Sequence, residues 1–384
     1  MQPWNDAGMK GPVVVVGNGV AGFAAASRLG EHGVDVTMVG PGLPHDRPPL
    51  SKRALAMGRL PLLADEDKLA AKGIRHVDGL VVDADLESHR LTIAPTGGGD
   101  PVELVPEAIV WATGLTYPLP PVAGIDVAHE NSTGAGMLEL AAQLAEDGRR
   151  VVVIGAGLIG TETAATLAAR HSVTLVDMLD RPLGRFLPRL SATALETLDR
   201  LGVRFVGGAE IGEVVANGTG HVVRTATHGD LHADVVVSAA GFRTSLPESL
   251  APDGRALTVD VDGTLRVPGL SDVFACGDVI AFPHPRYGRL QVPHWDNALH
   301  SGRQAADGVL NIGAAYARDP YYFSDIGPLR IQQVGLAADA VEWADEDGLV
   351  IGRDAAGRVT AVLFLNAPAR LKEARELLAA ATRP

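Results

Sequence analysis

Hydrophobic positions along the chain form short runs that are closed by glycine, and one such pattern occurs twice. Val13–Gly40 begins with four valines and a glycine turn, continues as an alanine-rich stretch and ends in a second apolar run. Val151–Asp177 repeats this order at an offset of 138 residues (155 − 17, between the first glycines). Four-residue apolar runs suit buried parallel strands, and small residues let a helix pack closely on a sheet. The pattern predicts two strand–helix–strand units.

A weaker repeat follows each unit. Ala108–Gly114 and Asp234–Gly241 each predict a strand that ends in a glycine turn. Gly269–Asp278 predicts a third strand with a Gly-Asp turn, and Ala298–Leu310 predicts a helix. We therefore expect an α/β fold with two three-layer dinucleotide-binding domains, the second inserted in the first.

The character of the chain changes near Asp319. An aromatic cluster at 321–323 is followed by strand-like stretches at Ile331–Leu336, Gly348–Ile351 and Val359–Leu365, and Arg370–Ala381 predicts a terminal helix. This pattern indicates a small C-terminal α+β domain. The expected boundaries are 1–120 with 246–318 for the first domain, 121–245 for the inserted domain and 319–384 for the C-terminal domain.

Composition narrows the classes of function. The 384 residues carry a net charge of −13, which disfavours nonspecific nucleic-acid binding. The run Val13–Val16 is too short for a membrane span of about 20 residues, and Met1–Gly11 is interpreted as a flexible lead-in. A single cysteine, Cys276, excludes an intrachain disulfide framework and a CxxC redox pair, and fits a cytoplasmic location.

Both glycine turns have the GxGxxG spacing between a strand and a helix. The first glycine makes the turn, the second lets the backbone approach a pyrophosphate, and the third packs helix on strand. The helix N-terminus then presents free N–H groups to the phosphates. Asp177 closes the second unit where a ribose-binding carboxylate is expected, whereas the first unit continues into Gly40-Pro41-Gly42. The motif glycines are Gly17, Gly19 and Gly22 in the first unit and Gly155, Gly157 and Gly160 in the second.

Further segments make the chain resemble the FAD-dependent NADH:ferredoxin and rubredoxin reductases, which belong to the pyridine nucleotide-disulfide oxidoreductase superfamily but lack its redox disulfide. The resemblance is greatest to the reductase component of aromatic-ring dioxygenase systems and covers about Val13 to Ala380. The segments that carry it are Asp46–Lys52 (DRPPLSK), Trp111–Gly114 (WATG), Val273–Val279 (VFACGDV), Trp295–Ala298 (WDNA) and Phe323–Leu336 (FSDIGPLRIQQVGL).

The resemblance implies that the first unit binds FAD. It places Lys52 at the flavin ring, Val82 at the adenine through its backbone, Asp278 at the ribityl chain and Trp295 beside flavin and nicotinamide. The full set of FAD positions that it implies is Gly17, Gly19, Val20, Ala21, Gly22, Arg47, Lys52, Val82, Ala112, Thr113, Gly114, Gly277, Asp278 and Trp295.

The resemblance also implies that the second unit binds NADH, with Glu162 close to the nicotinamide. Arg181 and Arg185 follow Asp177, where we expect them to meet phosphate or adenosine. No protein acid–base pair is expected, and the flavin-proximal residues are Lys52, Glu162 and Trp295. The NAD positions are Gly155, Gly157, Leu158, Ile159, Gly160, Glu162, Asp177, Arg185 and Gly241.

Three departures from the family pattern concern FAD contacts away from the flavin ring. Gly40-Pro41-Gly42 replaces the ribose acid in a shortened loop. Leu115, Thr116 and Tyr117 follow Gly114 where the family often has an arginine. The position of a second family arginine corresponds to about Ser132-Thr133, where this chain has none. We therefore expect either looser FAD binding or substitute contacts elsewhere in the chain.

The resemblance implies an enzyme that passes electrons from NADH through FAD to a ferredoxin- or rubredoxin-type carrier, which serves an oxygenase or a cytochrome P450. Two alternatives stay open: an NADH oxidase or dye/quinone reductase with a small-molecule acceptor, and a nonenzymatic protein of the apoptosis-inducing-factor type. We expect a monomer or homodimer without membrane or nucleic-acid partners.

Overall fold

The computed structural model describes residues 11–130, 132–185, 187–244, 246–247, 250 and 258–380. The chain divides into two compact units, each assembled from three segments. The first ten residues of the expected lead-in, and the last residue of the expected terminal helix, lie outside the described residues. The first unit holds Met1–Arg47, Pro61–Thr116 and Arg243–Asp319, and the second holds Pro48–Leu60, Tyr117–Phe242 and Pro320–Pro384.

The first unit is built on a five-stranded sheet in which all neighbouring strands are parallel. Its central valine strand is buried along its whole length, as the uniformly apolar sequence predicts. In spatial order the strands are β19 (Val273–Ala275), β7 (Ala108–Trp111), β1 (Val13–Val16), β2 (Val36–Val39) and β3 (Ile74–Val77).

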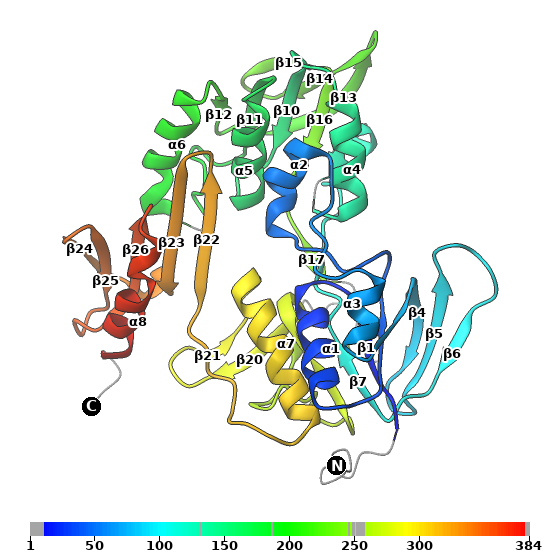
Figure 1. The fold of residues 1–384 in the computed structure, drawn as a ribbon. Helices are drawn as coiled ribbons and strands as arrows, with labels where there is room; N and C mark the ends of the chain where they lie inside the picture. Colours follow the sequence, from blue (N-terminus) through cyan, green and yellow to red (C-terminus); the bar gives the residue numbers. More distant parts are fainter. Residues whose placement is uncertain are drawn as a thin grey trace. The chain divides into compact units, whose positions relative to one another are not determined.

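Two helices of the first unit, α1 (Val20–Glu31) and α7 (Trp295–Val309), pack against each other (Figure 1). They touch closely because Gly302 has no side chain: a Cβ there would lie 2.2 Å from the carbonyl oxygen of Ala21. The other elements of this unit are α3 (Glu66–Ala71), the antiparallel strands β4 (Gly79–Asp85), β5 (Arg90–Pro95) and β6 (Val102–Leu104), the pair β8 (Leu115–Thr116) and β17 (Arg243–Thr244), and the strands β18 (Val259–Asp260), β20 (Ile280–His284) and β21 (Gly288–Leu290).

The second unit repeats the design with another parallel five-stranded sheet. In spatial order its strands are β12 (Arg204–Val206), β11 (Ser172–Val176), β10 (Arg150–Ile154), β16 (Val235–Ser238) and β9 (His129–Glu130). It also contains the helices α2 (Arg53–Met57), α4 (Gly134–Gln143), α5 (Leu158–Leu167) and α6 (Ser191–Arg200), and the antiparallel strands β13 (Ile211–Asn217), β14 (Gly220–Thr225) and β15 (Gly229–Ala233).

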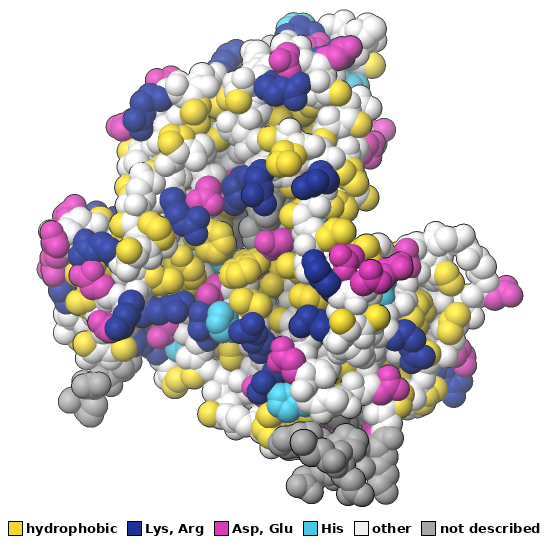
Figure 2. All heavy atoms as spheres, viewed as in Figure 1, with side chains coloured by type: hydrophobic (Ala, Val, Ile, Leu, Met, Phe, Trp, Pro, Cys, Tyr) yellow, Lys and Arg dark blue, Asp and Glu magenta, His cyan; other side chains and the backbone are white. Residues whose placement is uncertain are grey.

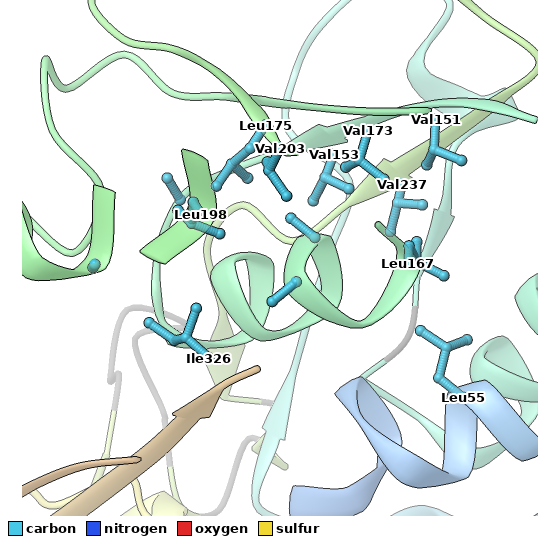
Figure 3. Close-up of a cluster of buried hydrophobic side chains, with 14 of the residues drawn as sticks. Leu55, Val151, Val153, Leu167, Val173, Leu175, Leu198, Val203, Val237 and Ile326 are labelled. Atoms are coloured by element: carbon cyan, nitrogen blue, oxygen red, sulfur yellow. The ribbon is translucent and has the colours of Figure 1, made fainter. Parts of the chain in front are cut away.

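The C-terminal segment of the second unit forms a five-stranded antiparallel sheet and ends in α8 (Leu371–Ala380). One hydrophobic cluster joins this sheet to the parallel one (Figure 3). Leu55, Val153, Leu167 and Ile326 belong to it, so α2, β10, α5 and β22 share a core. The strands of the C-terminal sheet are β22 (Tyr321–Ile326), β23 (Leu329–Gly335), β26 (Val359–Leu365), β25 (Leu349–Arg353) and β24 (Glu342–Glu346).

The predicted α/β fold is confirmed: both strand–helix–strand units form, and the second parallel sheet is inserted in the sequence of the first. Three details differ from the sequence expectation. Helix α7 begins at Trp295 rather than Ala298, because His294 caps it. Strands β22 and β24 lacked a clear signal, since β22 lies in the aromatic cluster and β24 is a highly charged edge strand. The proposed domain boundaries stay a prediction.

Among the helices that the structure describes, none combines the length and the hydropathy needed to cross a membrane.

Candidate cofactor and redox site

The first glycine turn is packed against the end of β7. Gly17 has a φ of +108°, and a Cβ on it would lie 2.3 Å from the carbonyl oxygen of Ala112. A Cβ on Gly22 would lie 1.9 Å from the carbonyl oxygen of Gly17, whereas the space around Gly19 is open. The turn therefore brings the predicted positions Gly17, Gly19, Val20, Ala21, Gly22, Ala112, Thr113 and Gly114 to one edge of the sheet.

The Gly277-Asp278 turn lies against the start of α1. A Cβ on Gly277 would lie 2.9 Å from the Cβ of Ala21. The amide of Gly277 donates to Oγ of Ser301 on α7 at 2.9 Å, which fixes the turn. Helices α1 and α7 thus hold the aspartate beside the glycine motif.

One oxygen of the Asp278 carboxyl group is buried without a hydrogen-bond partner among the described residues. Its Oδ1 is buried and accepts no hydrogen bond from any residue that the structure describes, although Asp278 as a whole is only partly buried. Burial raises the pKa of Asp278 to about 6, against the opposing charge of Arg47. An orphaned buried acceptor is costly unless a donor reaches it. A hydroxyl-bearing dinucleotide such as FAD supplies such a donor, so the residues present fit this cofactor.

We expect FAD-free protein to lose stability between about pH 4 and pH 6 because of Asp278. Its carboxyl binds a proton more tightly in the folded protein than in the unfolded chain. The contribution of this group to the free energy of unfolding is therefore greatest at low pH and falls as the group ionises. From pH 5 to pH 7.5, the free energy of unfolding of Asp278→Asn should rise by about 1 kcal/mol relative to that of wild type. Urea unfolding at pH 5 and pH 7.5 tests this prediction, and Asp83→Asn, which changes an exposed carboxylate, is the control. The same pH dependence of stability in wild type, Asp278→Asn and Asp83→Asn would refute it.

Three other predicted FAD residues belong to the first unit. Trp295 donates from Nε1 to Oδ1 of Asp46 at 2.9 Å, which ties α7 to the DRPPLSK segment. A Cβ on Gly114 would lie 3.8 Å from Nη1 of Arg47, so this arginine lies near the WATG turn. Val82 lies in β4, where the pairing with β5 shifts register, and its side chain is exposed.

The second glycine turn reproduces the first. A Cβ on Gly160 would lie 1.8 Å from the carbonyl oxygen of Gly155, and Gly155, with a φ of +100°, lies against Ala239 at the end of β16. Gly157 precedes α5, whose first two residues are Leu158 and Ile159. Gly241 has a φ of +79°, and no described atom outside its chain neighbours lies within 4 Å of its Cβ position.

Asp177 lies directly beside this turn. Its Oδ2 accepts from the amide of Ala156 at 2.5 Å, and its Oδ1 accepts from the amide of Leu179 at 2.7 Å. The carboxylate is therefore fixed in orientation at the carboxyl end of β11. Arg181 and Arg185 are both exposed beyond it.

Lys52 and Glu162 come together within the second unit. Glu162 is buried, and its Oε1 accepts from Nζ of Lys52 at 3.0 Å while Oε2 accepts from Oγ of Ser51 at 2.5 Å. Oε1 also accepts from Oγ of Ser324 at 2.7 Å and from the amide of Asp325 at 3.0 Å. One carboxylate thus joins the segment before α2, helix α5 and strand β22.

Sequence reasoning missed the roles of Ser51, Ser324 and Asp325 in this cluster. Oδ2 of Asp325 lies 3.6 Å from Nζ of Lys52, and Arg330 donates to Asp325 at 3.0 Å. The signal was present, because these residues lie in the two segments most typical of the resembled family. Their contact with Glu162 joins positions more than a hundred residues apart, which no local pattern reveals.

The positions of the two absent family arginines are occupied by local structure. Leu115 is buried in β8. Thr133 caps α4 by accepting from the amide of Gly136, and Ser132 donates to Glu130. Arg47, near Gly114, is the candidate for a substitute cation.

Cys276 is fully buried, and burial strongly raises the pKa of its thiol. The thiolate is the reactive form of cysteine, so this thiol is held unreactive. We expect Cys276→Ala to keep most of the turnover and native Cys276 to resist a thiol reagent until the protein unfolds. Loss of turnover with FAD still bound would reveal a thiol role.

Comparisons with known proteins apply to both units. Residues 11–302 match the family model described as pyridine nucleotide-disulphide oxidoreductase. The ferredoxin–NAD(+) reductase component of the anthranilate 1,2-dioxygenase system of Burkholderia cepacia is 33% identical over 97% of this chain and 95% of that protein. Rhodocoxin reductase of Rhodococcus erythropolis is 31% identical over 85% of this chain and 79% of that protein. The solved ferredoxin reductase for the CYP199A2 system from Rhodopseudomonas palustris aligns with a TM-score of 0.84 and 25% identity, covering 92% of this chain and 91% of that one.

Proposed function

Because the chain belongs to the pyridine nucleotide-disulphide oxidoreductase family, we propose that it passes electrons from NADH through FAD to a ferredoxin-type iron–sulfur carrier. The chain is an NADH-dependent flavoprotein oxidoreductase of the ferredoxin reductase type. The observation that carries the proposal is the pair of equivalent glycine turns, one in each unit, in a chain whose single cysteine cannot form a redox disulfide. The carrier in turn serves an oxygenase or a cytochrome P450.

Bound FAD supplies the chemistry that takes an electron pair from NADH and releases it one electron at a time. The chain's own residues bind and orient the two cofactors. We assign the first glycine turn and Asp278 to FAD and the second turn and Asp177 to NADH. Following the resemblance, Lys52 and Trp295 are our candidates for contact with flavin and Glu162 for contact with nicotinamide. Lys52 is oriented for that role by Glu162 and Asp325.

The carrier must dock on a chain of net charge −13, so recognition of an acidic carrier requires a local basic surface. Basic and acidic side chains are interspersed on the face drawn in Figure 2. Arg286 and Arg289 pair with Asp319 and Asp260, and Lys52 is engaged by Glu162. Arg53 is exposed and forms no ion pair among the described residues, so it is the best docking candidate of the four.

The proposal includes a cytoplasmic site of action, which the single cysteine suits, and a monomer or homodimer without membrane or nucleic-acid partners.

Cytochrome c reduction by NADH, with candidate ferredoxins and rubredoxins added one at a time, tests the acceptor. A cognate carrier should raise the rate well above that of the reductase alone. A rate that no carrier raises, together with rapid reduction of quinones or oxygen, would instead support the small-molecule acceptor. A protein that stays colourless after FAD is added would support the nonenzymatic binding protein.

A further inference from the structure

The turn after β2 is built so that no side chain fits where a ribose-binding acid would normally lie. A Cβ on Gly40 would lie 2.4 Å from Cγ of Asn18. Asn18 is buried, and its Nδ2 donates to the carbonyl oxygens of Pro41 at 3.1 Å and Gly42 at 2.6 Å. The Asn18 amide therefore occupies the space that an acid at position 40 would need, and it stabilises the shortened loop in that place.

The neighbouring strand supplies a carboxylate at the same edge of the sheet. Strands β2 and β3 are parallel with Val39 opposite Val77, so Asp78 follows β3 where Gly40 follows β2. Oδ1 of Asp78 accepts from the amide of Gly42 at 2.9 Å and from the hydroxyl of Thr96. These hydrogen bonds, from Thr96 first and Gly42 second, lower the pKa of Asp78 and keep the carboxylate ionised.

The two oxygens of Asp78 are thus in different situations. Oδ1 holds the loop, whereas Oδ2 accepts no hydrogen bond from the part of the chain that the structure describes. The other polar side chains on this loop are already committed to its backbone: Asn18 to Pro41 and Gly42, and a ring nitrogen of His76 to the carbonyl oxygen of Gly40 at 3.1 Å. Asp78 alone among these three offers a charged acceptor that is oriented and free.

We propose that Asp78 recognises the adenosine ribose of FAD, with Oδ2 accepting a hydrogen bond from the 2′-hydroxyl. In this chain the carboxylate follows β3 instead of β2. It still lies at the carboxyl edge of the parallel sheet, where dinucleotides bind. The inference rests on the proposed function, because it requires FAD at the first glycine turn. It identifies a substitute for the missing family acid.

Asp78→Asn tests this role selectively. The asparagine oxygen still accepts from Gly42 and Thr96, so the loop keeps its anchor, while the ribose-facing acceptor becomes an NH₂ donor. Dissociation constants of FAD and of the FAD analogue with 2′-deoxyadenosine are measured by flavin fluorescence on FAD-free protein. The matched control is Asp83→Asn, which neutralises an exposed carboxylate on β4, the next strand along the chain.

Wild type and Asp83→Asn should bind FAD about tenfold to a hundredfold more tightly than the deoxy analogue, the range expected for a charged hydrogen bond. In Asp78→Asn this ratio should fall toward one, because at most a weaker neutral hydrogen bond from the new NH₂ to the hydroxyl oxygen remains, and the circular dichroism should be unchanged. If the variant keeps the wild-type ratio, or wild type shows none, Asp78 does not read the ribose, while the function stands because FAD still binds. If wild type binds no FAD at all, the proposed function fails, and this inference with it.

Discussion

Glu162→Ala should lower the free energy of unfolding by up to about 3–5 kcal/mol, the cost of leaving a buried charge with no partner at all. The substitution removes the acceptor of Lys52, Ser51 and Ser324 at once, and the Lys52 side chain is only 19% exposed. Asp325 remains 3.6 Å from Lys52 and limits the loss. Because a typical domain is stable by only about 5–15 kcal/mol, the effect should be evident in urea unfolding.

The matched control is Glu196→Ala, which removes an exposed carboxylate on α6 and should change stability by less than about 0.5 kcal/mol. Glu162→Gln is a useful second variant, because it keeps an acceptor oxygen and should retain part of the stability that the alanine variant loses. Equal stability of Glu162→Ala and Glu196→Ala would show that the cluster around Glu162 does not hold these segments together.

NADH should be preferred over NADPH by about tenfold to a hundredfold in kcat/KM, with Asp177 as the main cause. A carboxylate at this point accepts a hydrogen bond from the ribose 2′-hydroxyl of NADH, whereas it repels the negatively charged 2′-phosphate of NADPH. The structure strengthens this argument, because the amides of Ala156 and Leu179 fix the carboxylate at the glycine turn. Arg181 and Arg185 oppose it by attracting phosphate, but they are exposed beyond the strand.

The same two amides change the choice of variant. Asp177→Ala leaves them without an acceptor and disturbs the turn, whereas Asp177→Asn keeps an acceptor and removes the charge. Asp177→Asn should therefore narrow the NADH/NADPH ratio of kcat/KM while the protein stays folded. Asp180→Asn, an exposed carboxylate three residues further on, should leave the ratio unchanged. An unaltered ratio in Asp177→Asn would assign the preference to Arg181, Arg185 or other residues.

Local patterns in the sequence predicted the parts of the fold that local physics determines. Apolar runs in the sequence predict the two valine strands. The glycine turns and the helices after them follow from positions that only glycine can occupy without a clash. The charged edge strand β24 has no such pattern, because its side chains are mostly exposed and the strand is held by pairing with β25.

The candidate site was predictable only in part for the same reason. The resemblance indicated Lys52 and Glu162 separately, yet their ion pair and the contacts of Ser51 and Ser324 depend on tertiary packing. The sequence showed that the ribose-binding acid was missing after β2. It did not show that Asn18 excludes such an acid, or that Asp78 lies beside the shortened loop at Gly40–Gly42. Strand order places Asp78 there, and sequence distance from Gly40 gives no indication of it.

Anaerobic addition of NADH to the FAD-reconstituted protein tests the central claim most directly. An NADH-dependent flavoprotein should lose its visible flavin absorbance as the flavin is reduced, and a subsequently added oxidised ferredoxin should restore it. Protein that binds FAD yet keeps its full absorbance in excess NADH would contradict the account.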